Sequence, residues 1–334
     1  MPGIIVVQGD GTAALCCNRL LSQAGFRVSL EGPARPRVPA VLLSEASQQL
    51  LRDVFNRSDL FEGLTRVNRR IVSRGQEAKP MALPHSAVVI SEQELLRRIG
   101  QAEAPEPSVD STPTGWAIVA APPLNGDIKE RHFGSRFASV AAIKLKASSP
   151  RDACWIESLD DGWLFLLPVN EGAWLLSVGG PVESLLARSR LIADQIQEAD
   201  SMKGAFASHP RIADALCAPG WLACGTAALG FDPLCGDGAG HAVREAILAS
   251  AAVRAMVEGA DVESVLAHYR SRLVAGFHRH LKLCLEFYRT GGEGSWWEEQ
   301  LAATIGGVEW CQSLRFDAPQ YRYRLNGFSL EAIE

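Results

Sequence analysis

Hydrophobic and polar positions follow two different periods along this chain. Near the start, the apolar, β-branched run IIVVQ at 4–8 precedes the turn GDGT. Helical spacing then covers 12–24, with Gly25 placed to end the helix, and FRVSLE at 26–31 has the pattern of a second strand. A buried strand, a helix and another strand in this order predict a βαβ unit with parallel strands.

The rest of the first hundred residues mixes loops, helices and a strand. Residues 32–40 hold three prolines and two arginines, which predict an irregular loop. Helical spacing is expected from Val41 to about Glu62, and SAVVI at 86–90 is a strand. Ser91 opens a helix with Glu94 three residues on, a capping box. The proline-rich stretch 101–114 that follows predicts a linker or surface loop.

Beyond this linker the period changes to that of strands. Short apolar runs separated by turn residues predict an antiparallel meander and not another βαβ series. Helical spacing returns over 181–200, GWLACG at 220–225 is a strand, and an Ala-rich helix covers 236–259. One further long helix, or two, is expected over 262–288. The strand runs lie at 116–122, 137–147, 154–158, 162–169 and 173–178.

Composition and charge restrict the classes of function. The 334 residues are 47% hydrophobic and 21% charged, enough for a large core. A net charge of −5 without a Lys/Arg run excludes nucleic acid and anionic membranes as expected partners. The chain has no apolar run near the ~18 residues that span a bilayer, and it starts without a signal-peptide pattern. We therefore expect a cytoplasmic protein whose eight cysteines, none in a CxxC pair, are reduced thiols.

The first glycine segment lies directly after the first strand. Gly9, Gly11 and Ala14 fit the dinucleotide pattern G-x-G-x-x-G/A at the head of a helix, where free N–H groups attract phosphates. Glu31, twenty residues after Gly11 at the end of the second strand, is placed to accept hydrogen bonds from a ribose. Asp10 opposes this interpretation, because a negative charge in that turn costs about 1 kcal/mol against a phosphate. The alternative is a plain turn whose glycines bind nothing.

The second glycine segment spans 220–242, GWLACGTAALGFDPLCGDGAGHA. A strand leads into Gly225-Thr226-Ala227, then Asp232-Pro233, and then a glycine-rich turn at the head of the long Ala-rich helix. Glycines allow a backbone to lie flat against a planar ligand, and the helix N-terminus is a positive pole. The glycines of this turn are Gly236, Gly238 and Gly240.

This second segment resembles the GDAA…DPL-x-G-x-G…A signature of FAD-dependent monooxygenases and halogenases of the para-hydroxybenzoate hydroxylase fold. It is most similar to the tryptophan-halogenase-like branch, which includes monooxygenases and flavoproteins that modify peptide side chains. DGWLFLLP at 161–168 is similar to that branch's W-x-W-x-x-P block, and the aromatic pairs at 287–288 and 296–297 fit as well. The chain looks like a shortened member, and only the glycine segments are specific.

The resemblance implies a fold and a set of cofactor-binding residues. The fold is α/β, a Rossmann-like FAD-binding domain (1–100 and 219–260) intergrown with an antiparallel-sheet substrate domain (115–218), plus a C-terminal helical region (261–334). The ADP half of FAD would be held by the first segment, the pyrophosphate and ribityl chain by Gly225 to Ala227, and the isoalloxazine ring by the turn after it. The implied residues are Gly9, Gly11, Thr12, Ala13, Ala14, Glu31, Gly225, Thr226, Ala227, Asp232, Pro233, Gly236, Gly238, Ala239 and Gly240.

The chain also departs from the family pattern. Thr226 replaces the aspartate of the GDA motif, Ser91 stands where an arginine is expected, and a second DG motif in mid-chain is absent. Lys79 lacks the surroundings of the halogenases' catalytic lysine, and Phe165 replaces the second tryptophan of W-x-W, so halogenation is disfavoured.

Other candidate residues are weaker. His280 and Cys284 share a helix face at i, i+4, but without a third ligand at a recognisable spacing no metal site is expected. His241 follows the glycine turn and is equally consistent with a flavin neighbour or a solvent-facing residue. The aromatic pairs near 287 and 296 are equally consistent with a substrate pocket or a core patch.

The sequence therefore predicts an FAD-dependent oxidoreductase, a monooxygenase that transfers oxygen through a flavin C4a-oxygen adduct. The substrate would be an aromatic small molecule or a side chain of a partner peptide, and NAD(P)H or a flavin reductase would reduce the flavin. No catalytic residue is identified, since the cofactor carries the chemistry. One alternative is a degenerate accessory or binding protein with weak or no FAD binding. Another is an NAD(P)-binding reductase that uses the first segment alone.

Overall fold

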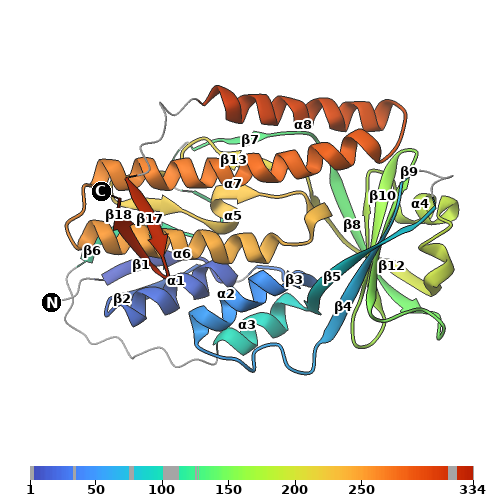
Figure 1. The fold of residues 1–334 in the computed structure, drawn as a ribbon, viewed down its shortest axis with the longest axis horizontal. Helices are drawn as coiled ribbons and strands as arrows, with labels where there is room; N and C mark the ends of the chain where they lie inside the picture. Colours follow the sequence, from blue (N-terminus) through green and yellow to red (C-terminus); the bar gives the residue numbers. More distant parts are fainter. Residues whose placement is uncertain are drawn as a thin grey trace.

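The computed structural model describes residues 4–32, 35–74, 79–100, 113–124, 126, 128–314 and 322–333. Two sheets lie at opposite ends of the long axis, with the long helices α6, α7 and α8 running along the first sheet (Figure 1). Within the described ranges, no helix is both long enough and apolar enough to cross a membrane.

The first sheet contains the predicted βαβ unit. Its strand order is β14-β15-β6-β1-β2, and β1 pairs in parallel with both β2 and β6. Ile5 and Val7 of β1 are fully buried because helices cover the sheet. The elements are β1 (Ile4–Gln8), α1 (Thr12–Gln23), β2 (Arg27–Glu31), β6 (Pro113–Val119), β14 (Cys217–Ala218) and β15 (Trp221–Ala223).

Strand β6 is in a different sheet from the one predicted. The run 116–122 was expected in the antiparallel meander, but β6 lies between β1 and β15 and is parallel to both. An apolar run of this length fits either kind of sheet, so only the long-range pairing decides between them. The linker prediction for 101–114 lies almost entirely outside the described residues.

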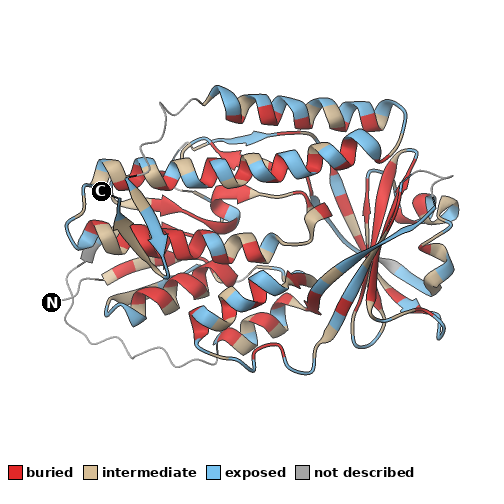
Figure 2. Cartoon of the chain, in the orientation of Figure 1, coloured by how far each residue is buried: buried red, intermediate tan, exposed pale blue. Residues whose placement is uncertain are grey.

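The second sheet has the order β12-β8-β11-β10-β9-β4-β5-β3. Its β9-β10-β11 part confirms the predicted meander, whereas β8 pairs with β11 and not with β9. Strands β9 and β10 are buried at every residue because α4 packs on one face and the α7–α8 pair on the other (Figure 2). The elements are β3 (Val41–Ser44), β4 (Thr65–Ser73), β5 (Met81–Ile90), β8 (Phe137–Leu145), β9 (Ala153–Leu159), β10 (Gly162–Pro168), β11 (Ala173–Val178), α4 (Val182–Arg188) and β12 (Ile196–Ala207).

Two helix predictions were too long. Residues Val41–Ser44 form β3, which pairs with β5, and α2 (Glu45–Phe55) begins only where the Ser44 side chain accepts a hydrogen bond from Ser47 N. Likewise, the run 181–200 is helical only in part, because its last residues enter β12. The apolar run of β3 fits either structure, and in both places sheet pairing prevails over the helical pattern. Strands β3, β4 and β5 join the second sheet, while α2, which lies between β3 and β4 in the chain, packs on α1 and α6.

The remaining helices agree with the predicted pattern. Ser91 caps α3 by accepting from Glu94 N, while the Glu94 carboxylate bonds Arg97 and Arg98 and does not return to the cap. The run over 262–288 is one helix, α7. These and the smaller elements are α3 (Glu92–Gly100), β7 (Glu130–His132), η1 (Ala193–Gln195), β13 (Arg211–Ala213), α5 (Gly225–Ala228), β16 (Leu229–Gly230), η2 (Pro233–Cys235), α6 (Gly238–Val257), α7 (Val262–Thr290), α8 (Ser295–Ser313), β17 (Tyr323–Asn326) and β18 (Ser329–Ala332).

Candidate dinucleotide-binding site

The first glycine segment makes the sharp turn from β1 into α1. Gly9 has a φ of +133° and its N–H donates to the carbonyl of Glu31 at 2.6 Å, which ties the turn to the end of β2. Gly11 is the N-cap of α1, with extended backbone and no side-chain cap among the described residues. The first turn of α1 holds no acidic side chain. Its N–H groups are therefore available to an anion.

Asp10 is balanced by two arginines from the proline-rich loop. Its carboxylate lies 2.7 Å from Nη2 of Arg37 and 3.6 Å from Nε of Arg35. Glu92, at the start of α3, holds this loop by pairing with Arg35 and by accepting from Val38 N at 2.8 Å. The negative charge that argued against phosphate binding is thus offset. The two arginines and Glu92 were not identified from the sequence, where the only signal was the basic, proline-rich loop.

The other residues of the first segment divide into buried and exposed. Thr12, Ala13 and Ala14 are at most 6% exposed, so only their backbone groups can face a ligand. Glu31 is exposed at the end of β2, and its carboxylate accepts from Ser29 Oγ at 3.1 Å. This is a suitable acceptor for a ribose hydroxyl.

Gly225 brings the two segments together at the start of α5. It has a φ of +55°, and a Cβ there would stand 2.9 Å from the Cβ of Ala13 and 3.0 Å from the carbonyl of Ala120. The starts of α1 and α5 therefore touch, and α5 also has no side-chain cap in the described chain. Gly225 N donates to Oε2 of Glu245 at 2.7 Å. Burial raises the pKa of Glu245 to about 8, so this carboxyl holds its proton near neutral pH.

Beside Gly225, Thr226 and Ala227 face opposite ways. Ala227 is buried in the core, whereas Thr226 is exposed and its hydroxyl is only weakly bonded, 3.5 Å from the carbonyl of Ala120. Arg211 donates to the Thr226 carbonyl at 2.8 Å. The hydroxyl of Thr226 is therefore available to a ligand at the position where the family pattern has a carboxylate.

Asp232 faces the protein interior. Its carboxylate pairs with Arg136 at 3.1 Å, accepts from the hydroxyl of Tyr288 at 2.7 Å and caps the turn by accepting from Leu234 N. The Asp232 and Arg136 side chains are both fully buried, and the guanidinium lies over the Tyr288 ring and bonds Gln300. Asp232 is therefore placed to hold the Pro233 turn from inside the protein.

The glycines of the second turn meet different surroundings. Gly236 has a φ of +66° and ends η2, and a Cβ at Gly240 would stand 2.1 Å from Ser47 Oγ. These two positions serve the turn and its packing. Gly238 is exposed, with no described atom within 4 Å of an added Cβ, and Pro233 and Ala239 are partly exposed beside it. Gly238 is therefore the glycine of this turn that is open to a flat ligand.

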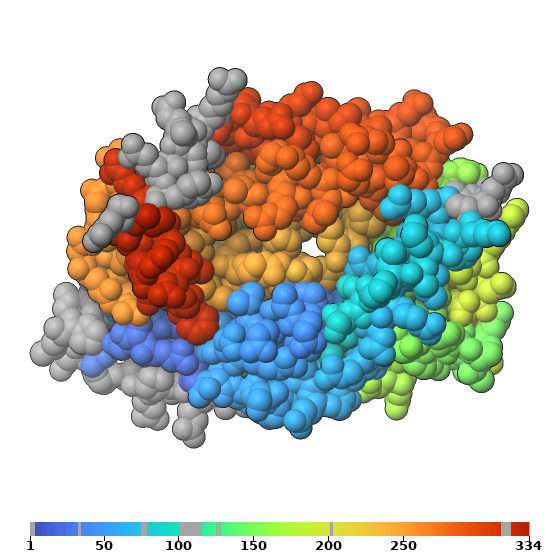
Figure 3. Space-filling model, in the orientation of Figure 1, coloured from blue at the N-terminus to red at the C-terminus, as the bar shows by residue number. Residues whose placement is uncertain are grey.

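Figure 3 shows an opening in the molecular surface beside this turn. It is bordered by the gold-coloured region that includes the second glycine segment, by orange α7 above and by blue α2 below. The N-cap of α6, Asp237, makes no side-chain cap either. Its carboxylate instead accepts from Ser47 Oγ at 2.7 Å and pairs with Arg244. Three helix N-termini without side-chain caps thus belong to the two glycine segments.

The surroundings of His241, of the aromatic pairs and of Lys79 show which of the alternatives holds for each. His241 stacks on Phe231 with ring centroids 4.0 Å apart, and burial lowers its pKa to about 4, so it is neutral. Phe287, Tyr288 and Trp297 are buried against Trp163, which makes the aromatic pairs mainly core residues. Lys79 is exposed, as expected.

The structure adds a third residue to the His280–Cys284 pair. Cys235, at the end of η2, lies close to both, and a hydrogen bond from Cys284 lowers the pKa of Cys235 to about 5. Sequence spacing alone had led us to expect no metal-ligand group here.

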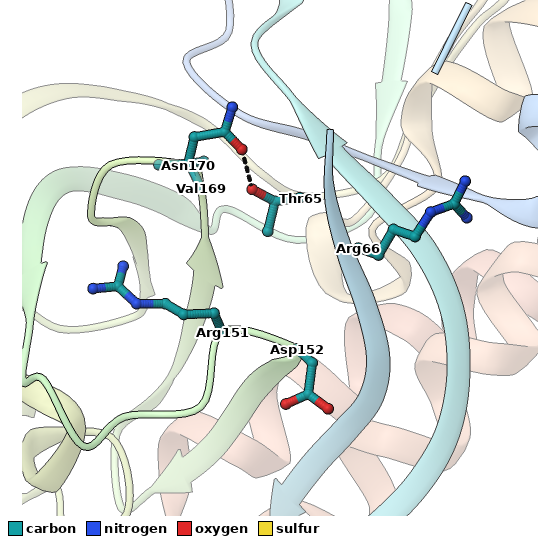
Figure 4. Close-up of a pocket in the computed structure, with 6 residues that line it drawn as sticks. All are labelled: Thr65, Arg66, Arg151, Asp152, Val169 and Asn170. Atoms are coloured by element: carbon teal, nitrogen blue, oxygen red, sulfur yellow. Dashed lines mark hydrogen bonds between the residues drawn. The ribbon is translucent and has the colours of Figure 1, made fainter. Parts of the chain in front are cut away.

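A separate depression of about 510 Å³ lies at the end of the second sheet (Figure 4). Thr65 donates to Oδ1 of Asn170 across it, and Arg66 and Arg151 extend on either side. None of its lining residues belongs to a glycine segment.

Comparisons with known proteins give no match to a family model and none to a curated protein sequence. Solved structures do match. The flavin-dependent halogenase CmlS has a TM-score of 0.77 at 17% identity, over 96% of this chain and 72% of that one. The peptidyl tryptophan dihydroxylase QhpG has a TM-score of 0.74 at 17% identity, over 100% and 86%. p-Nitrophenol 4-monooxygenase PnpA from Pseudomonas putida has a TM-score of 0.68 at 16% identity, over 95% and 97%. The chain therefore has the fold of the flavin-dependent halogenases and FAD-dependent monooxygenases.

Proposed function

We propose that this chain binds FAD and is an FAD-dependent oxidoreductase of the monooxygenase type. The observation that carries the proposal is the contact of Gly225 with Ala13, which joins the uncapped start of α1 to the start of α5. The uncapped start of α1 suits a pyrophosphate, because its free N–H groups favour negative charge and because Arg35 and Arg37 offset the charge of Asp10 beside it. The shared fold supports the same interpretation.

Each part of the cofactor has suitable residues in the chain. Glu31 would accept from the adenosine ribose, and the Gly11 backbone with Arg35 nearby would hold the pyrophosphate. The Thr226 hydroxyl would bond the ribityl chain, with one donor and acceptor in place of a carboxylate. The exposed backbone at Gly238 would lie against the ring. Bound flavin supplies the redox chemistry, and the protein contributes position and electrostatics.

The substrate and the reductant are further parts of the proposal. We propose an aromatic small molecule or a peptide side chain as substrate, and one structural neighbour is named a peptidyl tryptophan dihydroxylase. NAD(P)H or a partner flavin reductase would deliver the electrons, and a cytoplasmic location would suit both. Halogenation is disfavoured, since Lys79 is an exposed loop residue and Phe165 replaces a tryptophan.

A second candidate function is an accessory protein that keeps the fold without a tightly held flavin. The observation in its favour is Thr226, which offers the ribityl chain a weak partner. The two candidates differ in a property that can be measured directly, which is the affinity for FAD.

The test is an FAD titration of the purified chain by absorbance and thermal unfolding. Gly11→Val should abolish binding while leaving the fold intact, because Gly11 has extended backbone and its Cβ would meet only the end of the Arg35 side chain. Gly204→Val is the matched control, on exposed β12 with open space around it. A wild-type chain that neither becomes yellow nor gains thermal stability with FAD would exclude the enzyme and leave the accessory role. If the protein is yellow, rapid-mixing reduction with NADPH alone or with a flavin reductase identifies the electron donor.

A further inference from the structure

Two cysteines and a histidine meet between η2 and α7. Cys235 ends η2, and His280 and Cys284 lie one turn apart on α7. The three ligand atoms all lie within 4.8 Å of one another, and Nε2 of His280 is 3.3 Å from Sγ of Cys284. His280 is 1% exposed and Cys284 is fully buried, while Cys235 is partly exposed and leaves one side of the group accessible.

One ring nitrogen of His280, Nε2, faces this group. Nε2 accepts from Asp232 N at 2.9 Å, so Nε2 is unprotonated and the ring proton is on Nδ1. Nδ1 is buried and has no hydrogen-bond partner in the part of the chain that the structure describes. A buried imidazole held on one side only is unusual. The ring is therefore oriented by what lies at Nε2, where the two thiols converge.

The separation of His280 Nε2 and Cys284 Sγ is compatible with a tetrahedral zinc site. Zn–S bonds of about 2.3 Å and Zn–N bonds of about 2.0 Å put sulfur and nitrogen about 3.5 Å apart and two sulfurs about 3.8 Å apart. The observed 3.3 Å between Nε2 and Sγ is within a few tenths of an ångström of that value. Two thiolates and an imidazole are soft donors, which favour Zn²⁺ over Mg²⁺ or Ca²⁺.

We propose that Cys235, His280 and Cys284 bind one zinc ion, with a water molecule in the fourth position on the side of Cys235. Binding forms two Zn–S bonds and one Zn–N bond, and whatever protons the two sulfurs still carry are released to the solvent. No oxidant or reductant is needed, since zinc keeps its charge. The ion would take over the Nε2 electron pair that now accepts from Asp232 N.

The consequence is a clamp on the second glycine segment. Cys235 immediately precedes Gly236, so a metal bond to its sulfur would tie the Pro233–Gly236 turn to α7. It would act beside the Tyr288–Asp232 hydrogen bond, which joins the same two elements. The site goes beyond the proposed flavin chemistry and does not depend on it.

The test uses the full chain, reduced, stripped of metal and free of flavin, under exclusion of oxygen. Titration with Co²⁺ should produce thiolate-to-cobalt absorption that saturates at about one equivalent, and Zn²⁺ should remove it by displacement. Proton release during Zn²⁺ binding and elemental analysis of the dialysed protein provide independent measures. FAD addition is done separately, so a failure to bind flavin leaves this result unaffected.

Cysteine variants distinguish metal binding at this site from metal binding by other thiols of the chain. Cys235→Ser changes a partly exposed thiol and should keep the fold, as checked by circular dichroism, while losing the cobalt absorption. Cys284→Ser should lose it too, and Cys311→Ser, a buried thiol on α8, should keep it in full. Wild-type absorption retained in Cys235→Ser, or no cobalt absorption in the reduced wild-type chain, would overturn the proposal. So would a Cys235–Cys284 disulfide in the isolated protein together with no metal uptake after its reduction.

Discussion

The two glycine segments both lead into a helix, but they are held in place in opposite ways. The first is held near the surface, where Asp10, Arg35 and Arg37 form ion pairs with side chains 20–32% exposed. The second is held from inside the protein, where Asp232 and Arg136 pair with no exposure at all. The charged groups of the first segment therefore remain accessible at the surface, whereas those of the second hold a turn from inside the protein.

The largest expected difference between the two segments is the stability lost when the carboxylate of each is removed. Asp232→Ala should lower the free energy of unfolding by about 3–5 kcal/mol, because it leaves the Arg136 charge buried without its partner. Asp10→Ala should lower it by at most ~1 kcal/mol, as expected for a partly exposed pair. Denaturant unfolding measures both. The double variant Asp232→Leu/Arg136→Met should recover most of the loss, and equal effects of the two single variants would break the comparison.

Glu245 should give the second segment a pH dependence. Burial raises its pKa from an ordinary 4.5 to about 8, so between these values the folded chain keeps a proton that the unfolded chain has lost. The free energy of unfolding should therefore fall by a few kcal/mol as the pH rises from about 4.5 to about 8. Glu245→Gln should flatten this profile in denaturant unfolding measured at several pH values. An unchanged slope would show that another group titrates there.

Alanine substitutions at two neighbouring glycines should have different effects on stability, because one glycine is packed and the other is open. Gly240→Ala should cost about 1–3 kcal/mol of stability, since its Cβ would stand 2.1 Å from Ser47 Oγ and 2.3 Å from Asp237 Oδ1. Gly238→Ala should change stability by no more than ~0.5 kcal/mol, because the space around it is open. Melting temperatures provide the measurement. A large loss of stability in Gly238→Ala would contradict the conclusion that the space around Gly238 is open.

The smallest expected effect concerns the first segment and its ligand. Arg35→Gln should weaken FAD binding about fivefold, roughly 1 kcal/mol, because it removes a positive charge beside Gly11. The difference from wild type should shrink at high salt, since the site is partly exposed. Arg66→Gln, an exposed arginine far from the segment in the second sheet, is the control for net charge. Fluorescence titration of FAD at two salt concentrations measures both.

Much of the fold was predictable because its signals are local. The β1–α1–β2 unit, the cap at Ser91 and the Ala-rich helix α6 follow from periods and turn residues within short stretches. The place of β6 and the strand Val41–Ser44 were not predictable, because apolar runs of that length fit several partners. The partners of Asp10 and the position of Cys235 were missed for the same reason, since they come from another loop or element.

The sequence by itself determined that two glycine segments head two helices, and which family of folds they resemble. The spacing of glycines and the start of a helix depend on a few consecutive residues, so the order of residues is enough to recognise them. Only the tertiary structure decided which of these glycines have open space around them and which pack against the protein. Ser47 and Asp237, 190 residues apart, meet at Gly240, and Arg136 reaches Asp232 inside the core. Such contacts depend on how whole sheets and helices pack, and no local pattern contains them.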